Sequence, residues 1–204
     1  YLASFKKPMI VSTGGGTLDD VRRMYDAVLP LNEQLAILQC TAGYPPTFEE
    51  LELNVISTFR REFPLATIGF SSHDSGVAMA VAGYVLGARI VEKHFTLNRA
   101  MKGTDHAFSL EPVGLKKMVR DLQRVRLALG TGVKRTFASE QRPLLKMGKK
   151  LVAARPLTAG HVLHVSDIAI KSPGDGLPPY ELSRLLGKTL AEPMIEDQEF
   201  TFEI

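Results

Sequence analysis

Four strand–loop–helix units follow one another in the first 130 residues, and this repetition restricts the chain to folds built on a parallel sheet. Each unit has a short run rich in β-branched residues, a polar loop and a segment with apolar residues three and four positions apart. Strands that alternate with helices lie parallel and are joined by crossover helices. The predicted strands are 8–13, 35–41, 67–71 and 89–94, and the predicted helices are 18–29, 48–63, 76–86 and 113–129.

Local signals mark the ends of two of these helices. Thr17 and Asp20 have the spacing of a capping box at the start of helix 18–29, and Gly130 is placed to end the last helix. The stretch Gly14-Gly15-Gly16 lacks the G-x-G-x-x-G spacing of a dinucleotide-binding loop, and no suitable acid follows. We interpret it as a flexible strand-to-helix turn.

The pattern changes after Gly130. Residues 131–150 are basic and have no periodic apolar face, so they are predicted to be a linker. From Leu151 onward the elements are short and rich in proline and glycine turns, which indicates a compact, mostly β domain of about 55 residues. The sequence therefore predicts a domain over 1–130, a linker over 131–150 and a small domain over 151–204.

Four parallel units make either half of a barrel or most of an open doubly wound sheet. The strand ends favour the barrel, because a (β/α)8 barrel builds its active site from side chains at the carboxyl ends of its strands. All four predicted strands end in reactive or hydrogen-bonding residues: Ser12-Thr13, Cys40-Thr41, Ser71-Ser72-His73 and Glu92-Lys93-His94. We expect an α/β fold comprising the last four βα units of a TIM-type barrel, followed by the small mostly β domain.

The composition excludes several classes of protein. The chain has 204 residues, 45% apolar and 23% charged, which is ordinary for a globular protein. Its formal charge of +3 is scattered, so no nucleic-acid partner is expected, and no apolar run approaches the roughly 18 residues that span a membrane. The single cysteine, Cys40, excludes an internal disulfide framework and predicts a reducing cytoplasm.

Two histidines occupy equivalent positions after the third and fourth predicted strands. His73 and His94 are joined by one crossover helix, and adjacent parallel strands lie about 4.8 Å apart, so both imidazoles can share one ion. Two neutral imidazoles completed by water or substrate oxygens suit a divalent Lewis acid such as Mn²⁺, Mg²⁺, Co²⁺ or Zn²⁺. The alternative is a pair of hydrogen-bonded histidines on the rim.

Carboxylates and hydroxyls accompany the histidines. Glu92 lies two residues before His94, so strand alternation places both side chains on one face, where the carboxylate could exchange protons or bind sugar hydroxyls. A salt bridge is the alternative for Glu92. Asp105, in a polar loop, could fold back over the same mouth. Small hydroxyl side chains at the strand ends are either phosphate-binding groups or strand-end caps: Ser12, Thr13, Ser71 and Ser72.

In this order, the motifs resemble those of the sialic acid synthase family, also called N-acetylneuraminate synthases. The tail from Leu151 resembles the antifreeze-like (SAF) domain that follows the barrel in that family, so the resemblance covers nearly the whole chain. The matching stretches are Val11-Ser12-Thr13-Gly14, Leu38-Gln39-Cys40-Thr41 with Tyr44-Pro45, Gly69-Phe70-Ser71-Ser72-His73, Glu92-Lys93-His94-Phe95-Thr96-Leu97, Gly103-Thr104-Asp105-His106 and Lys171-Ser172-Pro173-Gly174.

The resemblance implies a reaction and roles for the strand-end residues. The family condenses phosphoenolpyruvate with N-acetylmannosamine or its 6-phosphate, which yields N-acetylneuraminate or its 9-phosphate and inorganic phosphate, with a divalent metal ion as cofactor. The implied metal ligands are His73 and His94. Implied contacts to phosphoenolpyruvate are Ser12 and Ser71, implied contacts around the acceptor sugar are Tyr44, Glu92 and Asp105, and Thr13 and Thr41 are further candidates for substrate binding. Glu92 is expected to transfer a proton or orient the sugar, and Asp105 to hold the sugar or activate water.

Three positions depart from the family pattern. Many bacterial members have Asp where Ser72 stands, whereas animal-type members have a small residue before the histidine and an acid after it, as at Asp74. We therefore expect Ser72 and Asp74 to bear on the choice of acceptor sugar, including a phosphorylated one. Ala42 lacks a hydrogen-bond donor used for phosphoenolpyruvate, and Ser172 replaces an arginine that reaches the partner subunit's sugar in many bacterial members.

The first four strands of the family, with the lysines that neutralise phosphoenolpyruvate, have no counterpart in this sequence. We expect the chain to be a fragment that is inactive or severely impaired alone, because an open half-barrel leaves unpaired strand edges. A domain-swapped homodimer is expected by resemblance. Two alternatives remain: a synthase of legionaminic, pseudaminic or spore-coat sugars, and a non-catalytic carbohydrate-binding relic, against which the intact His73, His94 and Glu92 argue.

Overall fold

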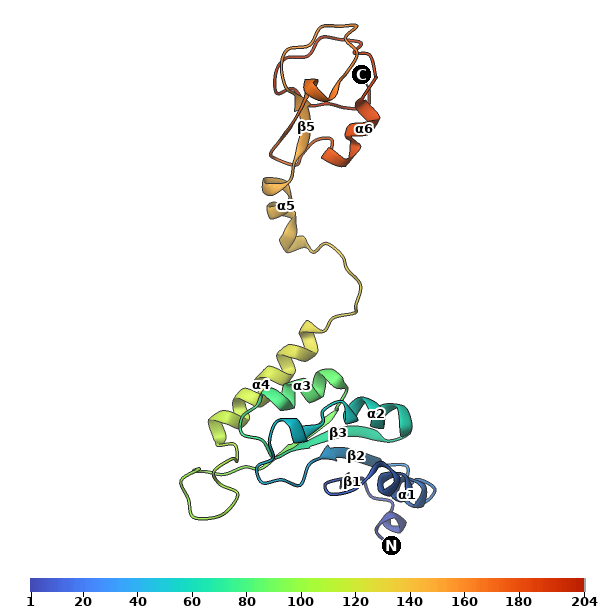
Figure 1. Cartoon of the computed structure of the whole chain (residues 1–204), viewed down its shortest axis with the longest axis vertical. Coiled ribbons are helices and arrows are strands. Elements are labelled where there is room, and N and C mark those ends of the chain that lie inside the picture. The colour runs from blue at the N-terminus through green and yellow to red at the C-terminus, as the bar shows by residue number, and fades with distance from the viewer. Residues whose placement is uncertain (204) are drawn as a thin grey trace. The chain divides into compact units, whose positions relative to one another are not determined.

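The computed structural model describes residues 1–203, and its contacts divide the chain into two compact units, Tyr1–Gly132 and Val133–Ile204. Figure 1 shows the helices and strands of the two units, and each unit has its own core. Ile204, the last residue of the predicted domain 151–204, lies outside the described residues. Within residues 1–203, no helix combines the length and the apolar character needed to cross a membrane.

The first unit is built on a four-stranded parallel sheet in the order β1-β2-β3-β4, which confirms the predicted half-barrel. A helix follows each strand in the chain, so every connection is a crossover (Figure 1). The strands are β1 (Met9–Ser12), β2 (Leu35–Cys40), β3 (Thr67–Ser72) and β4 (Ile90–Lys93), and the helices are α1 (Leu18–Val28), α2 (Val55–Glu62), α3 (Ala78–Leu86) and α4 (Pro112–Ala128).

Apolar side chains of the strands and helices form the core of this unit. Ile37 and Phe70, from the two central strands, are almost completely buried against α1 and α2. Burial of such side chains stabilises the fold by about 2 kcal/mol each. The strand and helix residues of this core include Val21, Leu35, Ile56, Phe59, Phe63 and Ile68.

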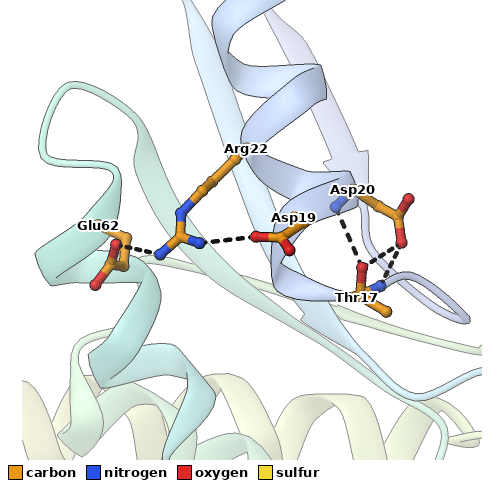
Figure 2. A network of polar contacts seen from close by, with 5 residues as sticks. All are labelled: Thr17, Asp19, Asp20, Arg22 and Glu62. Atoms are coloured by element: carbon orange, nitrogen blue, oxygen red, sulfur yellow. Dashed lines mark hydrogen bonds and ion pairs between the residues drawn. The ribbon is translucent and has the colours of Figure 1, made fainter.

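Both predicted helix-end signals are confirmed. The Thr17 side chain accepts a hydrogen bond from the Asp20 backbone N–H, and the Asp20 carboxylate accepts one from the Thr17 N–H at 2.8 Å (Figure 2). Gly130 follows Leu129, the C-cap residue of α4, and has a φ of 56°, a conformation that glycine adopts without strain. The local sequence thus determines where these helices begin and end.

An exposed ion-pair network links α1 to α2. The guanidinium of Arg22 reaches Asp19 within its own helix and Glu62 at the end of α2, each at 2.8 Å (Figure 2). The hydrogen bond from Arg22 lowers the pKa of Glu62. This network lies on the helix layer and makes no contact with the strand-end residues.

The predicted helix 48–63 is wrong in its first half. Glu49–Leu51 forms a single 3-10 turn, and Glu52 adopts a left-handed conformation with φ 44°, which a continuous helix cannot contain. The break leaves the Leu51 carbonyl free to accept a hydrogen bond from Gln39 Nε2 at 3.2 Å. This hydrogen bond attaches the connection between β2 and α2 to the end of β2 before α2 begins.

The second unit is small and mostly β, as predicted. Strands β5 (Lys150–Ala153) and β6 (Ile168–Lys171) pair antiparallel, and the short helix α6 (Leu182–Leu185) follows. The predicted linker 131–150 contains a short helix, α5 (Gln141–Met147). The buried apolar residues of this unit are Leu151, Ala153, Leu157, Leu163, Leu185, Leu190, Met194 and Phe200.

One carboxylate lies inside this small unit. Asp167 is fully buried and accepts hydrogen bonds from Arg155 at 2.6 Å, from His161 Nε2 at 2.8 Å and from the His164 N–H at 2.9 Å. These hydrogen bonds, the one from His161 above all, lower the pKa of Asp167 from 3.8 to about 2. The carboxylate thereby joins the turn before β6 to the loop after β5.

We predict that Asp167→Asn destabilises the second unit by about 2 kcal/mol at neutral pH, because the amide places N–H donors against the donors that surround it. Because the folded pKa is depressed, the carboxylate's contribution is complete above pH 4 and is lost as the pH falls from about 4 through 2. Urea unfolding of the whole chain, followed by the amide NMR signals of β5 and β6 at several pH values, measures both effects. Asp197→Asn, which breaks an exposed ion pair with Lys171, serves as control and should change little.

Candidate active site

The register of β3 and β4 brings two histidines together. Ser71 pairs with Glu92 and Ser72 with Lys93, so the residues that follow each strand, His73 and His94, emerge side by side. Their ring centroids are 5.1 Å apart and the rings are nearly perpendicular, at 78°. Two imidazoles from neighbouring strands thus face the same space at the carboxyl end of the sheet.

A backbone hydrogen bond orients His73. Its Nδ1 lies 3.0 Å from the carbonyl oxygen of Thr41, at the end of β2, and the ring is buried. Because a carbonyl only accepts, Nδ1 carries the proton and donates, which leaves the lone pair on Nε2. This tautomer is the one in which a histidine binds a metal ion through Nε2.

Aromatic rings surround the two histidines. Tyr44 stacks on His73 with ring centroids 4.4 Å apart and an angle of 23° between the planes, and it lies 5.8 Å from His94. Phe108, which is buried, lies 5.0 Å from His94 and 6.2 Å from Tyr44 between ring centroids. The rings restrict the orientations that both imidazoles can adopt.

The loop after β4 returns to the site through main-chain pairing. The Leu110 N–H donates to the His94 carbonyl at 2.8 Å, and the Thr96 N–H donates to the Leu110 carbonyl at 2.9 Å. This bridge carries Phe108 and Asp105 back toward His94. The nearer carboxylate oxygen of Asp105 is 3.7 Å from His94 Nδ1, which is too long for a hydrogen bond.

Glu92 and Ser71 form a pair on adjacent strands. The Ser71 hydroxyl donates to Glu92 Oε2 at 2.6 Å; Ser71 is buried and Glu92 is exposed. The hydroxyl therefore holds the carboxylate in one position at the strand end. Glu92 lies two residues before His94, so alternation along the strand directs both side chains to one face, where a fixed carboxylate can take or return a proton of a bound substrate.

The side chains of the remaining predicted residues make other contacts or face solvent. Ser12 is exposed on β1, the edge strand about 14 Å from β4 at three strand spacings. The Thr13 hydroxyl donates to the Leu38 carbonyl at 2.9 Å, and the Thr41 hydroxyl donates to the Glu50 carbonyl at 2.6 Å. Thr13 and Thr41 line a separate cavity of about 610 Å³, which also contacts α1 and α2.

Sequence reasoning missed the buried ion pair behind the histidines. Lys93 Nζ lies 2.9 Å from Asp74 Oδ1, and both side chains are almost fully buried, at 2% and 3% exposed. The Ser72 hydroxyl donates to Asp74 and is itself completely buried. Ser72 and Asp74, which we expect to bear on the choice of acceptor sugar, are thus both buried and hydrogen-bonded to Lys93. The sequence carried one signal of this pair. Lys93 stands between Glu92 and His94, and alternation along a strand directs its side chain to the opposite face.

The donor set fits a divalent ion with two protein ligands. Within residues 1–203, no group of three or more His, Cys, Asp or Glu side chains is placed to hold an ion. His73 and His94 supply two nitrogen donors, and His73 is already in the ligating tautomer. Substrate oxygens and water would complete the coordination of such an ion.

Two known families match different parts of the chain. Residues 1–134 match the NeuB family, and residues 150–202 match the SAF domain. The chain belongs to the NeuB family. The sheet of β1–β4 and the site at its carboxyl end lie within the matched NeuB region, and β5 and β6 lie within the matched SAF region.

Named relatives agree with this membership. The chain is 36% identical to the human N-acetylneuraminate-9-phosphate synthase over 97% of its own length and 55% of the relative, and 30% identical to the N,N'-diacetyllegionaminic acid synthase of Campylobacter jejuni over 97% and 60%. This NeuB-family chain therefore spans little more than half the length of the curated relatives that it matches.

Solved structures show the same fold. The spore coat polysaccharide biosynthesis protein SpsE of Bacillus subtilis superposes with a TM-score of 0.61 at 30% identity, over 100% of this chain and 62% of that protein. The sialic acid synthetase of Leptospira borgpetersenii, solved with citrate, superposes with a TM-score of 0.63 at 28% identity, over 70% and 50%. The NeuB-family relationship thus holds in the fold as well as in the sequence.

We predict that Tyr44→Ala lowers the free energy of unfolding of the first unit by about 1 kcal/mol, because the ring stacks on His73, whereas Tyr44→Phe keeps the stacking and costs less than about 0.5 kcal/mol. Urea denaturation measures both. Phe48→Ala removes an exposed aromatic ring from the same connection and is the matched control. Equal effects of Tyr44→Ala and Phe48→Ala would contradict a role for the stacking.

Proposed function

We propose that the protein containing this chain condenses phosphoenolpyruvate with an open-chain N-acetylmannosamine-type aldehyde to give a sialic acid, or its 9-phosphate, and inorganic phosphate. The observation that carries the proposal is the pairing of His73 and His94 at the ends of β3 and β4, with Asp105 near His94 and Glu92 held by Ser71. The names of its relatives, among them N-acetylneuraminate-9-phosphate synthases, support the same reaction.

In this proposal the histidines are ligands and the acids handle protons. A divalent ion bound by His73 and His94 would polarise the carbonyl oxygen of the aldehyde. The methylene carbon of phosphoenolpyruvate forms the new bond to the aldehyde carbon, and water adds at the carbon that bears the phosphate, whose C–O bond then breaks. We assign to Glu92, held by Ser71, the proton given to the aldehyde oxygen, and to Asp105 the proton taken from water.

The acceptor could belong to a neighbouring sugar class. Relatives of 30% and 31% identity are named N,N'-diacetyllegionaminic acid synthases, and another of 31% is named pseudaminic acid synthase. The higher identity to the human and mouse 9-phosphate synthases favours N-acetylmannosamine 6-phosphate as the first acceptor to test. A synthase of another nonulosonic acid is the second candidate.

Three further parts of the proposal concern the whole protein. We propose that the 204-residue chain alone is inactive, since β1 presents an open sheet edge and the chain spans about half of its relatives. We also propose a domain-swapped homodimer and a cytoplasmic location, the latter because the one cysteine, Cys40, is buried and unpaired.

We predict that the intact protein binds Mn²⁺ and that His73→Ala and His94→Ala each weaken binding by more than about 100-fold, since each removes one of two protein ligands. Titration followed by the electron paramagnetic resonance of free Mn²⁺ gives the dissociation constants. His164→Ala, an exposed histidine of the second unit, is the matched control and should bind normally. Unchanged binding in both site variants would rule out the ligand assignment.

We predict that the intact gene product, with any sequence that precedes Tyr1, releases phosphate from phosphoenolpyruvate only when an acceptor aldehyde is present. Mass spectrometry of the product with N-acetylmannosamine and with its 6-phosphate identifies the acceptor. Chelation should reduce turnover by about 1000-fold, and Mn²⁺ should restore it. Turnover by the 204-residue chain alone would contradict its proposed inactivity, and phosphate release without an acceptor would contradict the condensation itself.

A further inference from the structure

A lysine ammonium is buried directly behind the two histidines. Lys93 lies between Glu92 and His94 at the end of β4, and its side chain is only 2% exposed. A buried ammonium is costly unless its charge is paired and its hydrogen bonds are made. The contacts of Lys93 therefore show which groups it holds in place.

Lys93 has a partner for each of its three N–H donors. Nζ donates to the Asp74 carboxylate at 2.9 Å, to the Ser72 hydroxyl at 3.3 Å and to the Asp74 backbone carbonyl. The Ser72 hydroxyl in turn donates to the Asp74 carboxylate. Within residues 1–203, no buried side-chain polar atom lacks a partner, so this network is complete.

The residues of this network are the sequence neighbours of both candidate ligands. His73 stands between Ser72 and Asp74, the two residues that Lys93 contacts, and His94 is the next residue after Lys93. One ammonium on β4 thus contacts the residue before His73 and the residue after it. A displacement of Lys93 would change the separation of the two rings, now 5.1 Å.

A second cross-strand contact joins Ser71 to Glu92, the residues just before Ser72 and Lys93. Ser71 pairs with Glu92 in the register, and the Ser71 hydroxyl donates to the Glu92 carboxylate at 2.6 Å. Side chains of successive strand residues point to opposite faces of a sheet, so the Ser71–Glu92 and Ser72–Lys93 contacts join β3 to β4 on both faces. Strand ends that are joined on both faces have little freedom to separate.

We propose that Lys93 and Asp74 are positioning residues, which hold His73 and His94 at the separation needed to bind one divalent ion. This inference rests on the proposed function, because it takes the two histidines as ligands. A buried ion pair is seldom required for stability alone, since apolar residues of similar volume often replace it without loss. Its role here is to set the register and spacing of two strand ends.

The geometry suggests a variant that moves the charge without removing it. Ser72 Oγ is 3.3 Å from Lys93 Nζ, so a carboxylate at position 72 can reach the same ammonium. The transposed variant Ser72→Asp/Asp74→Ser keeps one buried carboxylate beside Lys93, whereas Asp74→Asn removes the charge and keeps the shape. Glu62→Gln, which breaks the exposed Arg22 pair on the helix layer of the same unit, is the matched control (Figure 2).

Mn²⁺ affinity of the intact protein tests the inference. We expect Asp74→Asn to fold and to bind Mn²⁺ about 10- to 100-fold more weakly, the transposed variant to bind within about threefold of wild type, and Glu62→Gln to bind normally. Wild-type affinity in folded Asp74→Asn would overturn the inference. A folded transposed variant as weak as Asp74→Asn would overturn it as well.

An apolar replacement keeps the test decisive if Asp74→Asn does not fold. Lys93→Met/Asp74→Leu retains the packing and removes both charges. We expect it to fold and to bind Mn²⁺ at least about 10-fold more weakly than wild type. Wild-type affinity in this variant would overturn the inference.

A second readout separates this inference from the ligand assignment. Nitrogen-15 NMR of the imidazoles reports the proton on His73 Nδ1, which donates to the Thr41 carbonyl at 3.0 Å. We expect this signal in the wild type and the transposed variant, and its loss in the apolar replacement. If the wild type binds no ion, the ligand assignment fails, and the same imidazole signal in all three proteins would independently overturn the positioning role.

Discussion

The parallel register between β3 and β4 is the constraint on which the candidate site depends. Because Ser71 faces Glu92 and Ser72 faces Lys93, the next residue of each strand is a histidine at the same edge of the sheet. A slip of one residue would send alternate side chains to the opposite face and separate the pair. The close approach of Gly69 to Ile90 across this pair favours the same register, since a Cβ at Gly69 would lie 2.7 Å from the Ile90 carbonyl oxygen.

Around this register, the site is supported by groups of different kinds. The apolar core of Ile37 and Phe70 attaches the helices to the sheet but does not orient any polar group. Orientation comes from directional contacts: the Thr41 carbonyl selects one tautomer of His73, and Tyr44 stacks on its ring. Such contacts come from β2 and its following loop, so three strand ends contribute to one constellation.

The second unit also contains a buried and hydrogen-bonded charge, but this charge joins loops instead of lying beside a candidate site. Asp167 is a buried carboxylate with three donors, all from the loop after β5. In a domain with a small core, one fully hydrogen-bonded charge can supply a large part of the net stability. The first unit uses its buried ion pair beside a candidate site, whereas the second uses a buried carboxylate to join its loops.

The sequence by itself determined the strands, the start of α1, the end of α4 and the family, because hydrophobic periodicity and the Thr17–Asp20 capping box act over a few residues. It also placed His73 and His94 at matching strand ends. Only the tertiary structure decided that Asp74 is buried against Lys93, that Phe108 returns to His94, and that the predicted helix 48–63 breaks at Glu52. Each of these depends on contacts between segments distant in sequence, whose pairing energies no local pattern contains.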